Sequence, residues 1–247
     1  MRRPNRTTPL RAVSSLNSLV IALFVPAALL ASGCASEIVP AGSNTTPTPT
    51  EGFRIVPEPE FNASGVSPVQ PIRITVTDGT LLSVSLTNDE GIKVKGELSD
   101  DQRRWTATEP LGFDKRYKWS GTAFDAEGER FPIEGSFRTL APDTVVAIQP
   151  NVVDGGVYPR TAPIMLRFST PIEDKAAVER ALTIDANPRT KGGWSWNEDA
   201  TMITWRPKQR WKAGTEVRLL ANLYAVRMSE GHYGATDVDV RFRITPD

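Results

Sequence analysis

Short runs in which apolar and polar residues alternate dominate the chain from about residue 70 onward, and they predict β-strands. Residues 72–76 carry an apolar side chain at every second position, and residues 82–86 repeat this period of two. Turn-forming pairs such as Asp78-Gly79 separate the runs. The same pattern predicts further strands at residues 94–98, 104–107, 116–123 and 133–139.

A second series of alternating runs follows a short linker, Leu140-Ala141-Pro142. It predicts strands at residues 145–148, 164–168, 182–184, 193–196, 202–205, 216–220 and 238–244. Residues 173–181 break the β pattern, because they are rich in helix formers, acidic at the start and basic near the end, and Pro171 lies just upstream. We expect one short helix there.

Each series has about six or seven short strands, which is the density of an immunoglobulin-like β-sandwich. We therefore predict an all-β fold of two tandem immunoglobulin-like β-sandwich domains, at residues 68–141 and 142–247, the second with one short helix. A weak internal repeat supports two modules of related plan, because residues 111–117 occupy the same late place in the first domain as residues 211–215 in the second.

The first 33 residues have the layout of a secretion signal. A basic leader with Arg2, Arg3, Arg6 and Arg11 precedes an apolar run at residues 19–30. The run is shorter than the roughly 20 residues of a spanning helix, and Pro26 interrupts it, so we do not expect a permanent transmembrane anchor. Apolar residues do not follow the arginine pair as a twin-arginine signal requires, which favours the general secretory route.

Cys34 is the expected lipidation site. With the preceding Leu30-Ala31-Ser32-Gly33 it resembles the lipobox of bacterial lipoproteins, in which the cysteine thiol is diacylated before cleavage makes that cysteine the first residue. Ala31 stands where the motif most often has Leu. The alternative is a chance cysteine in an ordinary cleavable signal, but Cys34 is the only cysteine in the chain and has no disulfide partner. Two acyl chains anchor stably, which predicts attachment to the extracytoplasmic face of the cell membrane.

Residues 34–67 are predicted to form a disordered tether rich in Ser, Thr and Pro. Residues 42–52 in particular contain too few apolar side chains to offset the entropy of ordering them. The prolines give the segment a partly extended character. Segments of this composition are O-glycosylated in some bacteria, so a glycosylated stalk stays open beside a plain spacer.

The charge balance argues against a nucleic-acid partner. The whole chain has 29 Lys and Arg and 29 Asp and Glu, and its formal net charge is zero. Removal of the signal takes away four arginines and leaves about four negative charges on the mature chain. We therefore expect no basic patch of the kind that binds nucleic acids.

Catalytic and metal-binding residues are scarce. The one cysteine is assigned to lipid and His232 is the one histidine, so no Cys-His pair is available. A Ser-His-carboxylate triad through His232 lacks a Gly-x-Ser-x-Gly motif, and residues 231–234 are expected to form a loop. The pairs Asp100-Asp101 and Asp237/Asp239 lack the spacing of a calcium loop, and zinc requires clustered Cys and His. We predict no catalytic residue, no metal site and no cofactor.

Six tryptophans are the most unusual feature of the composition. Four of them, Trp194, Trp196, Trp205 and Trp211, fall in the second domain, and a spacing of two places Trp194 and Trp196 on one face of a strand. These aromatics are candidates for binding the sugar rings of peptidoglycan or of an arabinogalactan-like polymer. The alternative that we favour is packing, because aromatic side chains dominate the energy of small sandwich cores.

Several short sequence motifs of the chain occur together in one known family. They are Trp205-Arg206-Pro207, Ala221-Asn222-Leu223-Tyr224 and residues 94–98, 105–113, 117–123 and 174–182. Together they resemble the paired N-terminal immunoglobulin-like domains of actinobacterial, mycobacterial-type L,D-transpeptidase lipoproteins, and the similarity covers residues 70–245.

The resemblance implies an envelope location, a spacer role and a relationship to peptidoglycan cross-linking. In that family a catalytic domain follows the two modules and cross-links stem peptides through a cysteine in a Ser-His-Gly-Cys motif. This motif has no counterpart in the chain, so no catalytic residue can be carried over.

Three interpretations of function remain. The first is a non-catalytic envelope lipoprotein, anchored to the membrane through Cys34, whose tether and two modules act as a spacer. The second is an interaction module that binds peptidoglycan or an envelope protein through an exposed sheet edge or the Trp-rich domain. The third is the N-terminal part of an active L,D-transpeptidase whose catalytic domain is missing from this chain.

Overall fold

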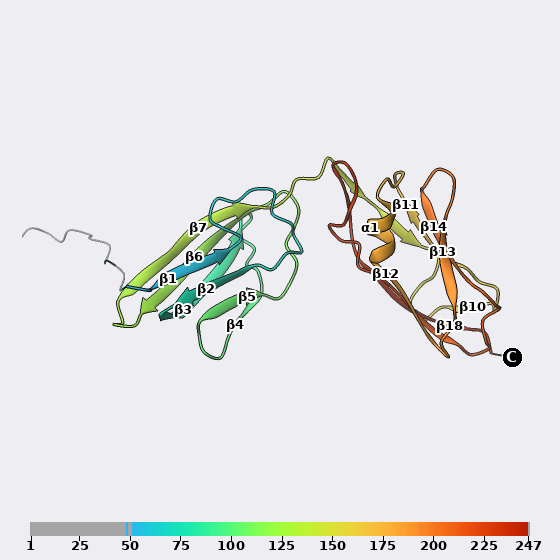
Figure 1. Cartoon of the computed structure of the whole chain (residues 1–247), viewed down its shortest axis with the longest axis horizontal. Helices are drawn as coiled ribbons and strands as arrows, with labels where there is room; N and C mark the ends of the chain where they lie inside the picture. Colours follow the sequence, from blue (N-terminus) through green and yellow to red (C-terminus); the bar gives the residue numbers. More distant parts are fainter. Residues whose placement is uncertain (1–47, 49–50, 247) are drawn as a thin grey trace, which may run out of the picture. The chain divides into compact units, whose positions relative to one another are not determined.

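Two separate hydrophobic cores organise the protein. The computed structural model describes residue 48 and residues 51–246 (Figure 1). One core gathers buried side chains between Phe53 and Phe137, and the other gathers buried side chains between Val146 and Ile244. Strands in several sheets surround both cores, so the predicted all-β fold with immunoglobulin-like domains is confirmed.

Seven strands form the first sandwich within the described residues. One sheet has the order β1-β2-β5-β4 and the other has the order β3-β6-β7, and every pair is antiparallel. A division into these four and three strands is that of a constant-type immunoglobulin domain. The strands are β1 (Arg54–Glu58), β2 (Arg73–Thr77), β3 (Gly79–Asn88), β4 (Gly96–Leu98), β5 (Arg104–Ala107), β6 (Arg116–Asp125) and β7 (Arg130–Arg138).

Strand β1 lies inside the segment that was expected to be a disordered tether. Its residues pair with β2, with Pro57 opposite Ile74, and the side chains of Phe53 and Val66 on either side of it are buried. The expectation of disorder over residues 34–67 is therefore wrong for this strand and for its buried flanks. Prolines suggested disorder, but β1 is an edge strand, where a residue without an N–H can point its nitrogen away from the ladder.

Strand β6 starts with the tyrosine corner that is typical of immunoglobulin folds. The buried Tyr117 accepts a hydrogen bond at its hydroxyl oxygen from the backbone N–H of Gly112, at 2.8 Å. Burial raises the pKa of the Tyr117 phenol. Trp119 follows two residues later, where antibody domains carry a disulfide cysteine, and packs edge-to-face on Trp105 with ring centroids 5.5 Å apart. Aromatic packing therefore fills the place of a disulfide.

The second sandwich has two four-stranded sheets and one small sheet. Their orders are β10-β18-β15-β12, β13-β14-β11-β9 and β16-β17-β8. Because β12 and β13 each end a sheet, both are edge strands, and residues 188–191 join them. The strands are β8 (Thr144–Val146), β9 (Ile148–Pro150), β10 (Val157–Tyr158), β11 (Ile164–Phe168), β12 (Leu182–Asn187), β13 (Gly192–Trp196), β14 (Met202–Pro207), β15 (Glu216–Ala221), β16 (Arg227–Ser229), β17 (His232–Gly234) and β18 (Val238–Ile244).

The helix expected at residues 173–181 is present as α1 (Lys175–Arg180). A side-chain oxygen of Asp174 accepts a hydrogen bond from the N–H of Ala177 at 2.9 Å and caps the N-terminus. Arg180 lies in the last turn, where a cation is favourable, and Val178 is buried in the core. The cap and the charge order in the sequence thus correspond to the observed helix.

Residues 232–234 form strand β17, so the expectation of a loop at residues 231–234 is wrong there. The strand pairs with β16 and, in parallel, with β8. Gly231 does turn the chain, with a φ of 66°. Gly234 suggested a second turn residue, but a Cβ on it would lie 1.9 Å from the backbone oxygen of Leu223, so this glycine permits β17 to approach the backbone of the segment between β15 and β16.

The internal repeat seen in the sequence has a structural counterpart. Leu111 and Trp211 are both buried. Three residues after each, Asp114 and Gly214 adopt positive φ angles of 50° and 72°. Strands β6 and β15 then begin two residues later. The two domains therefore have the same turn geometry immediately before strands β6 and β15.

Candidate functional site

The residue with the clearest functional signature in the sequence, Cys34, lies outside the described residues, as does the whole secretion signal at residues 1–33. Within the described part of the chain, no helix has the length and apolar character needed to cross a membrane.

Trp194 and Trp196 lie on the same face of β13, as their spacing predicts, and both are half-buried. Trp194 stands opposite Trp205 of β14 in the antiparallel register. The exposed Ser195 between them points to the other face of the strand.

Contacts with helix α1 and strand β11 occupy the Trp196 ring. Its Nε1–H donates a hydrogen bond to Oε1 of Glu179 at 2.7 Å. The Lys175 ammonium lies 5.7 Å from its ring centroid, and the Phe168 ring stacks on it with centroids 5.7 Å apart. Trp196 thereby connects strand β13 to helix α1.

Trp205 and Trp211 belong to the second core. Trp211 is 0% exposed and Trp205 is 6% exposed, and their ring centroids are 5.0 Å apart. The Nε1–H of Trp211 donates to the backbone oxygen of Ala162 at 2.9 Å, and its own backbone oxygen accepts from Nε of Arg160. The four tryptophans therefore do not form one exposed row.

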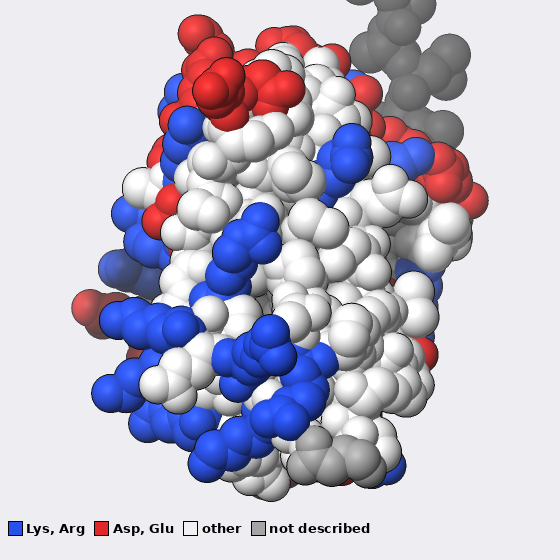
Figure 2. Space-filling model, turned by 90° about the vertical axis from the view of Figure 1, so that its right-hand side faces the viewer, with Lys and Arg blue, Asp and Glu red and all other residues white. Residues whose placement is uncertain are grey.

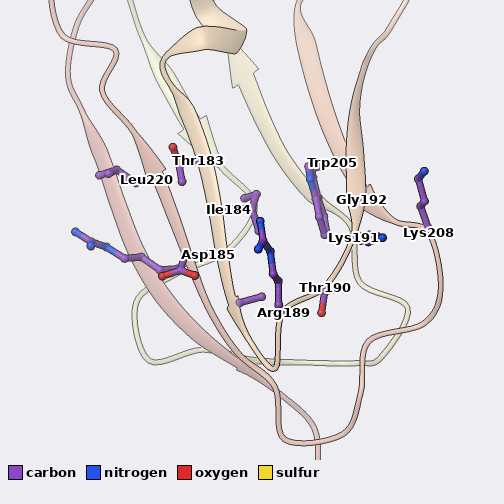
Figure 3. Close-up of a pocket in the computed structure, with 12 residues that line it drawn as sticks. Thr183, Ile184, Asp185, Arg189, Thr190, Lys191, Gly192, Trp205, Lys208 and Leu220 are labelled. Atoms are coloured by element: carbon purple, nitrogen blue, oxygen red, sulfur yellow. The ribbon is translucent and has the colours of Figure 1, made fainter.

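A hollow of about 720 Å³ lies where the edge strands β12 and β13 leave the second sandwich open (Figure 3). Ile184 of β12 forms one side of it, and Gly192 and Trp205 form another. Arg189, from the loop that joins the two strands, extends along β12 beside Ile184 (Figure 3). We call this hollow the β12 groove.

Three cations of the β12 groove, Arg189, Lys191 and Lys208, are exposed and make no ion pair with any described residue. The loops that carry the two lysines touch, because the backbone N–H of Lys208 donates to the backbone oxygen of Lys191 at 2.8 Å. The groove therefore carries more positive than negative charge, because Asp185 is the one carboxylate among its lining residues.

The fourth cation of the groove, Arg218, is paired. Its guanidinium donates hydrogen bonds of 2.8 and 2.7 Å to the two carboxylate oxygens of Asp239 on the neighbouring strand β18. The hydrogen bond from Arg218 lowers the pKa of the Asp239 carboxyl and raises the pKa of the guanidinium. This fork-to-fork geometry is the strongest form of ion pair at an exposed site.

Cations extend beyond the groove over the surface of the second sandwich. Arg206, Arg210 and Lys212 are also exposed. Figure 2 shows Lys and Arg side chains gathered over the lower part of the view, with Asp and Glu at the top. Cations therefore gather on this face although the net charge is small, because a net charge is a sum and does not report where the charges lie. The absence of a nucleic-acid partner stays a prediction.

The groove cations were not candidates in the sequence. They belong to no motif, although residues 206–212 place a cation at every second position, which was a signal for a charged surface. Only the pairing of β13 with β14 brings the loop at residues 188–191 beside Lys208. That juxtaposition depends on the fold.

Three of the four acidic residues that were weighed as calcium ligands, Asp101, Asp237 and Asp239, have other partners. Asp101 lies in a turn, where it accepts hydrogen bonds from the Ser99 hydroxyl and the Arg103 N–H. Asp237 accepts from the N–H of Tyr224. Among the residues that the structure describes, no three His, Cys, Asp or Glu side chains come together in a way that could hold a metal ion.

These features define the class of protein, an all-β chain of immunoglobulin-like domains. The model of the bacterial Ig domain family matches residues 63–227, and the chain belongs to that family. The chain is homologous to the N-terminal part of mycobacterial L,D-transpeptidases.

Two curated relatives come from Mycobacterium tuberculosis. The chain is 37% identical to L,D-transpeptidase 5 over 98% of its own length and 53% of that protein. It is 36% identical to L,D-transpeptidase 2 over 74% of its own length and 44% of that protein. The chain thus spans about half the length of the curated relatives it matches.

Solved structures of other L,D-transpeptidases also match. The crystal structure of Mycobacterium tuberculosis L,D-transpeptidase 1 is 24% identical over 42% of this chain and 40% of that chain, with a TM-score of 0.30. An L,D-transpeptidase from Mycobacterium smegmatis is 26% identical over 40% of each chain, with a TM-score of 0.29. These scores are too low to add to the argument.

Proposed function

We propose that this chain is a lipid-anchored lipoprotein of the cell envelope whose immunoglobulin-like domains act as a non-catalytic spacer linked to peptidoglycan cross-linking. The observation that carries the proposal is the homology to L,D-transpeptidases over 98% of the chain. The lipobox at Cys34 supplies the anchor on the extracytoplasmic face of the membrane.

The chemistry of the side chains supports a non-catalytic role. The one cysteine is assigned to lipid, and the one histidine, His232, lies within the paired strand β17. Carboxylates with a lowered pKa are exposed and owe the shift to a surface partner, which is a cation for Glu90 and Asp239 and a hydroxyl for Asp101 and Asp199. Shifts of this origin belong to surface ion pairs and turns and not to a nucleophile beside a base.

A covalent-labelling experiment tests the non-catalytic role. The full chain is incubated with a carbapenem, and its mass is measured by mass spectrometry beside an active L,D-transpeptidase as the positive control. We expect the control to gain the mass of the drug and this chain to remain unchanged. A carbapenem adduct on this chain would overturn the non-catalytic role.

Cell fractionation tests the anchor separately. We expect the natural chain in the membrane fraction and the Cys34→Ser variant in the aqueous extracytoplasmic fraction, because the serine hydroxyl cannot take the thioether-linked lipid. A Cys34→Ser variant that stays with the membrane to the same extent would contradict anchoring through this residue.

The β12 groove favours a second role as an interaction module. Its unbalanced cations and its two edge strands are features that a pure spacer does not need. Sedimentation of the full chain with isolated cell wall measures this role, and no enrichment in the pellet would count against a wall-bound partner.

A further inference from the structure

Strand β12 has a free edge that opens into the β12 groove. It pairs with β15 along its whole length, from Leu182 to Asn187, and it is the last strand of its sheet. The free edge of such a strand presents unpaired N–H and C=O groups, which can accept a further strand. The backbone of β12 is thus available for strand addition.

The alternation of β12 fixes where the side chains of an added strand would point. Ile184 and Ala186 face inward and are half-buried, whereas Thr183 and Asp185 are exposed on the outer face. A strand placed beside β12 has the same period of two, so every second side chain would enter the groove beside Ile184. Trp205 and Gly192 lie across the groove from that row.

Positive charge meets those inward side chains. Arg189 extends along β12 on the Ile184 side, whereas Lys191 and Lys208 lie across the groove, beyond Trp205 and Gly192 (Figure 3). None of these three cations makes an ion pair with a described residue, and Asp185 is the one carboxylate among the lining residues, so positive charge exceeds negative charge in the groove. The planar guanidinium of Arg189 is suited to a bidentate carboxylate.

A second hollow, on the outer side of β12, lacks this property. It has a volume of about 780 Å³ and is lined by Arg218, Arg241 and Arg243. Each of these arginines lies in an ion pair with Asp239 or Glu216. The two hollows share Asp185, Ala186 and Arg218, and the outer hollow adds no arginine without an ion pair.

We propose that the β12 groove binds an extended acidic segment of a partner protein, which adds as a fifth strand beside β12. Alternate residues of that segment carry carboxylates, about 7 Å apart along the strand, of which one pairs with Arg189, while Lys191 and Lys208 attract the segment from across the groove. Backbone hydrogen bonds to β12 supply the affinity, and the three cations select the acidic sequence. This inference deepens the interaction role proposed above.

A peptide-binding experiment on the full chain in detergent tests the proposal. The probe is a fluorescent hexapeptide of alternating Glu and Val, and the comparison peptides are an alternating Lys and Val hexapeptide and a Glu-Val copy with N-methyl groups at every second residue. We expect the Glu-Val probe to bind, and both comparison peptides to bind at least tenfold more weakly. Hydrogen exchange of the amides at residues 183–187 should slow when the probe is bound.

Two charge-reversal variants distinguish binding in the groove from attraction to the rest of the cationic surface. Arg189→Glu should weaken probe binding at least tenfold. Arg206→Glu should change it less than twofold, because Arg206 lies on β14 outside the groove and is also exposed. Equal losses in the two variants would mean that the probe senses only the net charge, and they would overturn the proposal.

Other outcomes are equally decisive. If no peptide binds, the three cations are solvated charges that keep the β12 edge from pairing, and the proposal fails. If polygalacturonate binds to the groove, the Glu-Val peptide does not and exchange at residues 183–187 is unchanged, the groove is a site for acidic glycans instead. None of these results alters the carbapenem or fractionation tests, so a failure here is distinguishable from a failure of the spacer role.

Discussion

Among single residues, Trp211 contacts the second core through both its ring and its backbone. Its side chain is fully buried, its Nε1–H is bonded to Ala162, and its backbone holds Arg160 through the carbonyl oxygen. Removal of the ring leaves a cavity and an unsatisfied carbonyl at Ala162. The role of Trp211 is therefore to pack the second core.

We predict that Trp211→Ala lowers the free energy of unfolding by about 3–5 kcal/mol. The measurement is urea denaturation followed by circular dichroism. Trp194→Ala is the matched control, because Trp194 is only half-buried, and it should cost clearly less. Equal losses for the two variants would contradict the burial difference.

The exposed pair Arg218 and Asp239 gives a prediction about pH. The hydrogen bond from Arg218 places the folded-state pKa of the Asp239 carboxyl below its unfolded value of about 3.9. The pair therefore stabilises the folded chain fully above that unfolded value, and this stabilisation disappears as the pH falls through the folded-state pKa.

An NMR titration of the Asp239 carboxyl carbon measures the effect. Arg218→Gln should move the pKa of Asp239 upward. Arg241→Gln should move it less, because the Arg241 guanidinium lies 3.9 Å from the carboxylate whereas that of Arg218 lies 2.7 Å from it. No movement in Arg218→Gln would show that the bond is not formed in solution.

At the scale of elements, a glycine packs on a tryptophan ring at corresponding places in the two sandwiches. A Cβ on Gly96 of β4 would lie 2.0 Å from the Trp105 ring of β5, and a Cβ on Gly192 of β13 would lie 2.1 Å from the Trp205 ring of β14. In each case the glycine lets the ring lie flat across the neighbouring strand. The contact fixes the spacing at one edge of each sandwich.

Gly192→Ala should therefore destabilise the second sandwich by about 1–3 kcal/mol, because the new methyl group overlaps a ring that is itself buried. Gly193→Ala is the control, since a Cβ there meets nothing within 4 Å, and its effect should stay within about 0.5 kcal/mol. Thermal denaturation of the two variants side by side measures the difference. A Gly193→Ala loss as large as that of Gly192→Ala would refute the ring contact.

Strands with a clean alternation were predictable from the sequence, and irregular ones were not. The pattern at residues 238–244 coincides with β18, because inward Val238, Phe242 and Ile244 alternate with exposed residues. The sequence pattern did not predict β1, because its prolines suggested disorder, although an edge strand tolerates them. It did not predict β17, because Gly234 suggested a turn, although this glycine permits a close backbone contact. Both depend on neighbours that are distant in the sequence.

The candidate site likewise combines features that the sequence predicts with features that only the fold reveals. The spacing of Trp194 and Trp196 predicted their shared face, because that is a property of one strand. The β12 groove could not be predicted, since it needs two edge strands, their joining loop and Lys208 to come together in space. Local geometry follows from local pattern, whereas a groove follows from the register of several strands.

At the scale of the whole molecule, charge is separated even though the sum is near zero. The full chain is neutral, yet Lys and Arg gather over one part of the second sandwich and Asp and Glu over another (Figure 2). An uneven charge distribution steers the encounters of a protein with charged partners, so the proposed spacer would present its cationic part to anionic ones. The proposed anchor at Cys34 would confine those encounters to the membrane surface.

The central claim, a lipoprotein anchored through Cys34, is tested most directly by the intact mass of the native protein extracted from membranes. The predicted result is a chain that begins at Cys34 and carries the added mass of a diacylglyceryl group, with or without a third acyl chain. A chain that begins at any other residue, or one that begins at Cys34 without lipid, would contradict the claim.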